Sequence, residues 1–294
     1  MSNNPFQELI ELKPNKEFFI GIDSDGCVFD TMEIKQKECF CPNLIKHYNL
    51  QTISKYARDT WTFVNLYSKS RGCNRFIAVQ KFFELLAERK EVKTRGFKNP
   101  DITALKTWLK NETKLSQSVL EKYIKTEKDS FLETTLEWSV AVNLAIEQMV
   151  YGISPFPFVK ESLDELTLIA DAMVVSQTPG EALTREWKEN KLEHHLRFIA
   201  GQEYGTKTEH LKYAAKGKYP DDKILMIGDA LGDLKAAKSN GVLFFPVIPG
   251  KEVESWEKFY KEGLQKFFNG TFKGIYEDNL IKEFDSYLPE HPTW

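Results

Sequence analysis

Two aspartates, Asp23 and Asp25, follow a short apolar run, residues 18–22, and are themselves followed by Gly26. An apolar run without polar interruption is typical of a strand buried on both faces of a parallel sheet. Carboxylates at the end of such a strand would lie at the carboxyl edge of the sheet, where open α/β folds bind their ligands. Alternatively, the sequence DSDG is only a solvated turn, because Asp, Ser and Gly are common turn residues.

Polar residues suited to a phosphoryl group follow other apolar runs. Ser176 and Gln177 come directly after the run 172–175, and a hydroxyl and N–H groups before a helix suit anionic oxygens. Serine is just as common as a helix cap for purely local reasons. Lys207 precedes a helical segment, and its ammonium group could neutralise a transferring phosphoryl group. Most lysines, however, are simply solvated.

Two further carboxylates, Asp229 and Asp233, occur one helical turn apart in the segment GDALGD, after the apolar run 223–227. Clustered carboxylates repel one another and are costly to bury unless a cation joins them. Oxygen ligands close to a phosphate favour Mg²⁺, which takes only one or two protein carboxylates.

The order of apolar runs and helical segments predicts how these residues are positioned. Four runs after residue 153 alternate with helical spacing, which predicts a parallel sheet with crossover helices, and the run 18–22 adds a fifth strand. The segment between residues 31 and 154 shows helical spacing only, so we expect an inserted all-helical unit. The four later runs are residues 172–175, 196–200, 223–227 and 242–247.

Composition narrows the class of protein. The 294 residues are 41% hydrophobic and 28% charged, as in a globular protein, and the net charge of −3 gives no general attraction to nucleic acid or anionic membranes. No stretch approaches about 20 uninterrupted apolar residues, so we expect a cytoplasmic protein without a membrane span. The four cysteines are not spaced as paired zinc ligands, and we expect reduced thiols.

The segments DSDGCVFD and GDALGD, with Ser176 and Lys207 between them, occur in the order of the four motifs of the haloacid dehalogenase-like (HAD) hydrolase superfamily. The chain therefore resembles that superfamily over residues 17–30 and 159–250. The resemblance implies a Rossmann-like three-layer α/β core with a five-stranded parallel sheet, formed by residues 1–30 and 155–294. It also implies that residues 31–154 form a C1-type helical cap domain.

The resemblance implies a role for each matching residue. Asp23 would be the nucleophile and Asp25 the general acid and base, while Ser176, Gln177 and Lys207 would bind the phosphoryl group. Lys207 would also offset the charge of Asp23.

The resemblance implies a Mg²⁺ site at the same place. Asp229 would ligate the ion together with Asp23 and the backbone carbonyl of Asp25. Asp233 would orient the site or ligate through water.

The sequence departs from the usual pattern in small ways. Ser24 replaces a bulkier residue between the two aspartates, and Ala230 stands where a hydroxyl residue is common. Lys212 is a less favoured candidate for the lysine role.

Together these features predict a Mg²⁺-dependent phosphoric monoester hydrolase that acts on a small phosphorylated metabolite through an aspartyl-phosphate, as a monomer or dimer. A phosphomutase uses the same residues and is the main alternative; a non-catalytic binding protein with this fold is a second. Carbon–halogen and phosphonate hydrolases would lack an aspartate at position 25, and a P-type pump needs membrane spans.

Substrate choice is expected to depend on the helical unit. Lys69, Arg71 and Arg75 lie in a basic segment between two predicted helices, where Arg71 and Arg75 could grip a second anionic part of the substrate. The alternative is a solvated basic loop.

Overall fold

The computed structural model describes residues 4–294, which fold into two compact units. One unit comprises the chain up to Met32 together with Gly152–Leu288. The other comprises Glu33–Tyr151 together with Pro289–Trp294.

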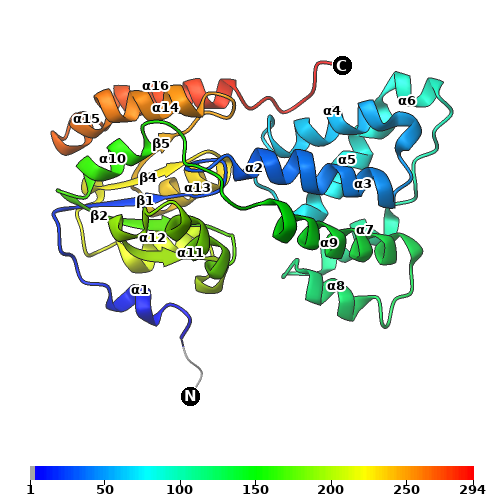
Figure 1. Cartoon of the computed structure of the whole chain (residues 1–294), viewed down its shortest axis with the longest axis horizontal. Coiled ribbons are helices and arrows are strands. Elements are labelled where there is room, and N and C mark those ends of the chain that lie inside the picture. Colours follow the sequence, from blue (N-terminus) through cyan, green and yellow to red (C-terminus); the bar gives the residue numbers. More distant parts are fainter. Residues whose placement is uncertain (1–3) are drawn as a thin grey trace. The chain divides into compact units, whose positions relative to one another are not determined.

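The first unit is built around a five-stranded sheet whose strand order is β3-β2-β1-β4-β5, and every neighbouring pair is parallel (Figure 1). The sheet confirms the predicted α/β fold class. From β1 the chain first adds β2 and β3 on one side of the sheet and then β4 and β5 on the other. Ligands of such sheets bind where the two directions part, which here is at the carboxyl ends of β1 and β4. The strands are β1 Phe18–Ile22, β2 Ala170–Val175, β3 Leu196–Ala200, β4 Ile224–Gly228 and β5 Leu243–Pro246.

Helices cover both faces of the sheet, which gives three layers (Figure 1). On one face, the apolar side chains of the strands pack with α10, α11, α14 and α15; on the other they pack with α1, α12 and α13, while α16 contributes to both clusters. The helices are α1 Gln7–Glu11, α10 Val159–Leu166, α11 Gly180–Glu189, α12 Lys207–Ala214, α13 Leu231–Asn240, α14 Glu252–Lys258, α15 Leu264–Phe268 and α16 Ile275–Ser286.

The central strand β1 is buried along its whole length because it has a covered neighbour on each side and helices on both faces. Successive side chains alternate, so that Ile20 and Ile22 enter one apolar cluster and Phe19 enters the other. Gly21 has a packing role, since a Cβ atom there would lie 3.0 Å from the Leu211 side chain of α12. The missing side chain therefore lets α12, which begins at Lys207, lie close to the sheet.

The second unit contains helices and no strand among the described residues. Its core is aromatic: Trp61 is stacked on Phe40 and packs edge-on against Phe82 and Trp138. Helix α2, Thr31–Ile34, begins in the first unit and ends in this one. The α-helices that follow it are α3 Cys41–His47, α4 Ser54–Asn65, α5 Arg75–Glu88, α6 Lys90–Thr94, α7 Thr103–Asn111, α8 Gln117–Tyr123 and α9 Ser130–Met149.

The segment Pro289–Trp294 belongs to the helical unit, whereas the sequence placed it with the α/β unit. The backbone N–H of Lys69 donates to the carbonyl of Pro289 over 3.2 Å. The guanidinium carbon of Arg89 lies 4.3 Å from the centre of the Trp294 ring. The same ring packs edge-on against Phe63. Sequence periodicity gives no signal for such a return of the chain, because these contacts join residues far apart.

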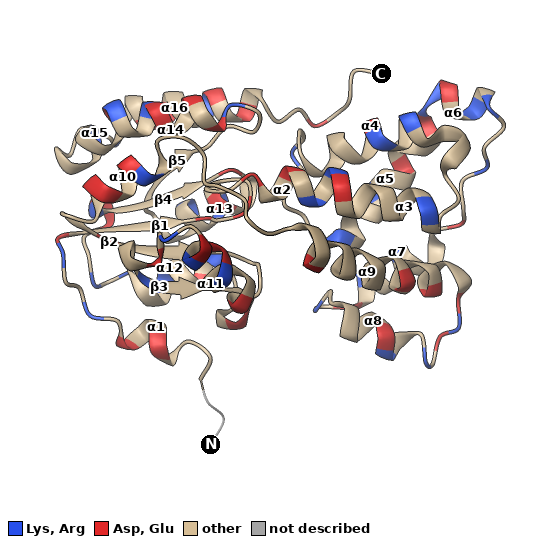
Figure 2. Cartoon of the chain, viewed as in Figure 1, with Lys and Arg blue, Asp and Glu red and all other residues tan. Residues whose placement is uncertain are grey.

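Acidic and basic residues are interspersed along the helices of both units (Figure 2). Among residues 4–294, no helix has the length and apolar character needed to cross a bilayer.

Candidate active site

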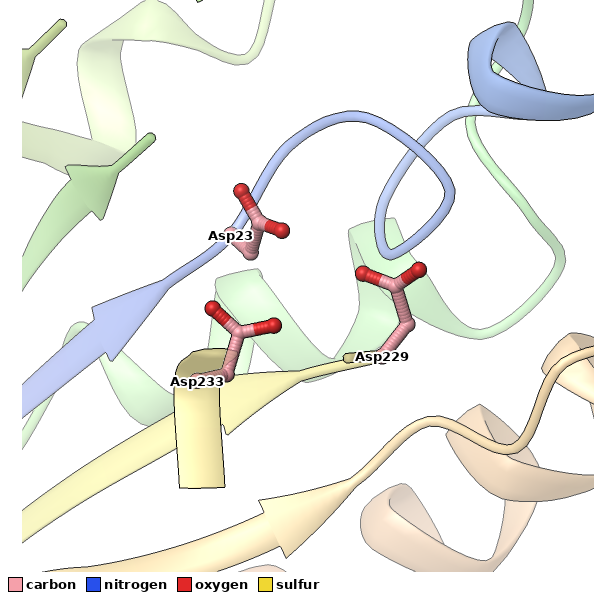
Figure 3. A group of neighbouring side chains, drawn as sticks. All are labelled: Asp23, Asp229 and Asp233. Carbon is pink, nitrogen blue, oxygen red and sulfur yellow. The ribbon is translucent and has the colours of Figure 1, made fainter. Parts of the chain in front are cut away.

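Three aspartates meet at the carboxyl edge of the sheet. Asp23 directly follows β1, Asp229 directly follows β4, and Asp233 lies in the first turn of α13. All three side chains are buried and point toward one another, with one oxygen of each within 4.8 Å of the others (Figure 3). Three of the four aspartates that the sequence singled out, Asp23, Asp229 and Asp233, therefore lie together at this edge.

Gly228 makes room for this arrangement. A Cβ atom at position 228 would lie 2.3 Å from Cγ of Asp233, which is shorter than any tolerable contact. The Asp233 carboxylate also accepts a hydrogen bond from the backbone N–H of Ala230, over 3.0 Å. The glycine before Asp229 and the turn after it therefore hold Asp233 against the end of β4.

Lys207 is the cation of the cluster, and local sequence fixes its place. The Thr206 hydroxyl accepts from the backbone N–H of Glu209, and the Glu209 carboxylate accepts from the backbone N–H of Thr206, which is a capping box that starts α12 at Lys207. The Lys207 ammonium then lies 2.7 Å from an Asp23 oxygen and 2.6 Å from an Asp233 oxygen.

The pKa values of these groups reflect burial and mutual repulsion. Burial raises the pKa of Asp23 to about 6; the charge of Lys207 opposes this and that of Asp229 adds to it. Burial likewise raises the pKa of Asp233 to about 6, against the charge of Lys207. For Lys207, burial acts to lower the pKa, but the charges of Asp23 and Asp233 outweigh it and raise the pKa above its usual value. Burial and repulsion between the carboxylates thus outweigh the charge of Lys207 at Asp23 and at Asp233.

Asp25 faces two threonine hydroxyls that the sequence did not single out. The hydroxyl of Thr31 donates to one of its oxygens, and the hydroxyl of Thr178 donates to the other over 2.5 Å. Both oxygens of the Asp25 carboxylate are therefore engaged by hydroxyl groups. In the sequence, Thr178 could have been noticed as a second hydroxyl residue two positions after Ser176.

Ser176 and Gln177 form the turn that follows β2, the neighbour of β1. Ser176 is buried, and its hydroxyl accepts from the backbone N–H of Thr178 over 3.2 Å. The Gln177 side-chain amide donates to the carbonyl of Gly205 over 2.8 Å, which joins this turn to the loop before α12. This hydrogen bond therefore holds the turn that contains Ser176 against the loop that leads to Lys207.

Comparison with known families identifies the chain. The family model described as haloacid dehalogenase-like hydrolase matches residues 80–247, more than half of the chain. The protein belongs to the haloacid dehalogenase-like hydrolase family. The matched region includes Lys207, Asp229 and Asp233, whereas Asp23 and Asp25 precede it.

Solved structures similar to this hydrolase share little of its sequence. A haloacid dehalogenase-like family hydrolase from Streptococcus pneumoniae is 13% identical, covering 82% of this chain and 90% of that one, with a TM-score of 0.44. A relative of the same description from Xanthomonas campestris is 9% identical, covering 93% and 98%, with a TM-score of 0.44. A predicted phosphatase from Clostridium acetobutylicum is 12% identical, covering 79% and 85%, with a TM-score of 0.42. No curated protein matches the hydrolase by sequence.

The three clustered aspartates of this hydrolase form a set of ligands that fits a divalent cation. Asp23, Asp229 and Asp233 offer oxygen ligands only, and they are close enough to share one ion. Hard cations prefer oxygen ligands, and a second positive charge would favour the ionised forms of Asp23 and Asp233, whose pKa values are raised by burial and by a neighbouring carboxylate. For Asp25, a role of its backbone carbonyl as a further ligand remains a prediction.

The two arginines proposed for substrate binding make contacts inside the helical unit of the hydrolase. Arg71 is buried and donates to the carbonyl of Leu66 over 3.0 Å. Arg75 donates to the Ser139 hydroxyl over 3.0 Å and to the side chain of Asn143 over 2.8 Å, and burial lowers its pKa to about 10. These contacts give both arginines a structural role, and a role in substrate binding remains a prediction.

Proposed function

We propose that the protein is a Mg²⁺-dependent phosphoric monoester hydrolase that acts on a small phosphorylated metabolite through an aspartyl-phosphate at Asp23. The observation that carries this proposal is the contact of Lys207 with both Asp23 and Asp233 beside the carboxylate of Asp229, all at the carboxyl edge of the sheet. This arrangement combines a nucleophile with a fixed cation and an oxygen-ligand set, as phosphoryl transfer requires.

In the first proposed step, an oxygen of Asp23 attacks phosphorus while the bond to the leaving oxygen breaks, and Asp25 gives that oxygen a proton. In the second step, a water molecule attacks the same phosphorus, the bond to Asp23 breaks, and Asp25 takes a proton from the water. Thr31 and Thr178 hold the Asp25 carboxyl in place for both transfers.

Charge is the main difficulty of both proposed steps, because an anion attacks an anionic group. Lys207 offsets the charge of Asp23, and the hydroxyl of Ser176 and the turn at Gln177 would donate to the phosphoryl oxygens. Asp23, Asp229 and Asp233 would hold Mg²⁺, which would supply further positive charge next to the phosphoryl group.

We expect the proposed enzyme to be located in the cytoplasm and to be a monomer or a dimer. All four cysteines are free thiols, which suits a reducing compartment.

Hydrolysis of p-nitrophenyl phosphate tests the proposal. We expect release of inorganic phosphate with Mg²⁺, loss of the activity on chelation, and recovery when Mg²⁺ is restored. A folded protein that releases no phosphate from this or from a broad panel of phosphate esters would overturn it, and interconversion of sugar phosphates without net phosphate release would identify a phosphomutase.

Metal binding can be measured independently of turnover. At Mg²⁺ concentrations about 100 times the Kd, we expect a stabilisation of roughly 2.7 kcal/mol, which raises Tm by about 4 °C for a chain of this length. Asp229→Asn should abolish this rise, whereas the control Asp222→Asn, at an exposed aspartate, should retain it. An equal rise of Tm in both variants would contradict the assigned site.

A further inference from the structure

Two buried tryptophans donate hydrogen bonds to the loop that carries both catalytic aspartates. Nε1–H of Trp187 in α11 donates to the hydroxyl oxygen of Ser24 over 3.0 Å. Nε1–H of Trp256 in α14 donates to the backbone carbonyl of Cys27 over 2.7 Å. Both indole rings are fully buried, so neither N–H has access to bulk water as an alternative partner.

Ser24 stands between Asp23 and Asp25, and its polar groups are engaged on several sides. Its hydroxyl donates to the Glu186 carboxylate over 3.2 Å while it accepts from Trp187, which fixes the orientation of the hydroxyl. Its backbone N–H donates to an oxygen of Asp23 over 2.8 Å. A displacement of Ser24 would therefore be felt by the nucleophile directly.

The Ser24 carbonyl extends the same connection along the loop. It accepts hydrogen bonds from the backbone N–H groups of Val28, over 2.9 Å, and Phe29, over 3.2 Å. Phe29 in turn packs edge-on against the Trp187 ring, at 5.6 Å between ring centres. Trp187 thus contacts the loop at two places, through a hydrogen bond at Ser24 and through ring packing at Phe29.

We propose that Trp187, acting through Ser24, is a positioning residue that sets the placement of Asp23 and Asp25, with Trp256 supporting the same loop at Cys27. This role rests on the proposed phosphatase function. Misplacement of a reacting group by about 1 Å can cost about 10²-fold in rate. Ser24, which departs from the bulky residue usual at this position, is explained as the acceptor for Trp187.

A double-mutant cycle on Trp187→Phe and Ser24→Ala tests the proposal through kcat and KM for p-nitrophenyl phosphate and through Tm. Each single variant is expected to lower kcat by about 10- to 100-fold with KM changed less than about threefold. The double variant is expected to lose no more kcat than the more impaired single variant, because both changes remove the same hydrogen bond.

The cycle separates positioning from stability. Ser24→Ala leaves the buried Trp187 N–H without its acceptor, and adding Trp187→Phe removes that unpaired donor, so Tm should recover in the double variant. We expect kcat not to recover with it. Trp108→Phe is the matched control: Trp108 is fully buried in the helical unit, and its Nε1 has no hydrogen-bond partner among residues 4–294. This control should leave kcat unchanged.

Three results would overturn the positioning role: an unchanged kcat in Trp187→Phe, a recovery of kcat in parallel with Tm in the double variant, or a loss confined to KM. With an active wild-type protein, any of them removes the role of Trp187 and leaves the proposed function intact. A wild-type protein without phosphatase activity would instead remove the proposed function, and the positioning role with it.

Discussion

Asp23→Asn is expected to lower kcat for phosphate ester hydrolysis by on the order of 10⁴-fold or more, as the loss of a nucleophile does in other covalent mechanisms. The side-chain amide has nearly the shape of the carboxylate but cannot form the acyl phosphate. The effect should appear in kcat with every substrate, because the same bond to phosphorus must form in each case. Steady-state kinetics at saturating Mg²⁺ measure it.

The control for this variant is Asp222→Asn, which makes the same chemical change at an exposed aspartate of the α/β unit. It should retain wild-type kcat. Circular dichroism and Tm establish that Asp23→Asn is folded. If the folded Asp23→Asn protein retained activity within about tenfold of wild type, Asp23 would not be the nucleophile.

Asp25→Asn is expected to lower kcat by about 10²- to 10⁴-fold for an alkyl phosphate, whose leaving oxygen needs a proton. The loss in the first step should be smaller for p-nitrophenyl phosphate, since p-nitrophenolate leaves without protonation. The second step still lacks its base, so the phosphorylated enzyme should accumulate with this substrate. Rapid-quench kinetics with both substrates separate the two steps.

The dependence on leaving group is the decisive feature of this variant. Thr178→Val provides a related comparison, because it removes a donor to the Asp25 carboxylate while the carboxylate itself remains. It should show a smaller loss than Asp25→Asn. Equal losses of Asp25→Asn on both substrates, without accumulation of a phosphorylated enzyme, would show that Asp25 does not transfer protons.

Much of the sheet was predictable because its strands are short apolar runs, and all of them except the edge strand β3 are buried along their whole length. The runs at 18–22 and 196–200 match β1 and β3 in both bounds, while β2 begins two residues before the expected run and β4 and β5 differ at their ends by one residue. The convergence of Asp23 and Asp229 followed from the rule that parallel strands end at one edge.

Other features depend on contacts that sequence spacing does not encode. Thr31 and Thr178 lie 6 and 153 residues from Asp25 in the chain, and only the fold shows that both hydroxyls donate to its carboxylate. Trp187 lies within an ordinary amphipathic helix, and only the fold reveals that its indole N–H reaches Ser24. The return of Pro289–Trp294 to the helical unit is of the same kind.

Detection of a phosphoryl group on Asp23 tests the central claim most directly. The Asp25→Asn protein would be mixed with p-nitrophenyl phosphate and Mg²⁺, quenched in acid during turnover, digested and examined by peptide mass spectrometry. We predict one phosphoryl group on the peptide that contains Asp23, and none on that peptide in the Asp23→Asn protein. Phosphate release by the wild-type enzyme together with a phosphoryl group on a different residue, or on none, would contradict the account.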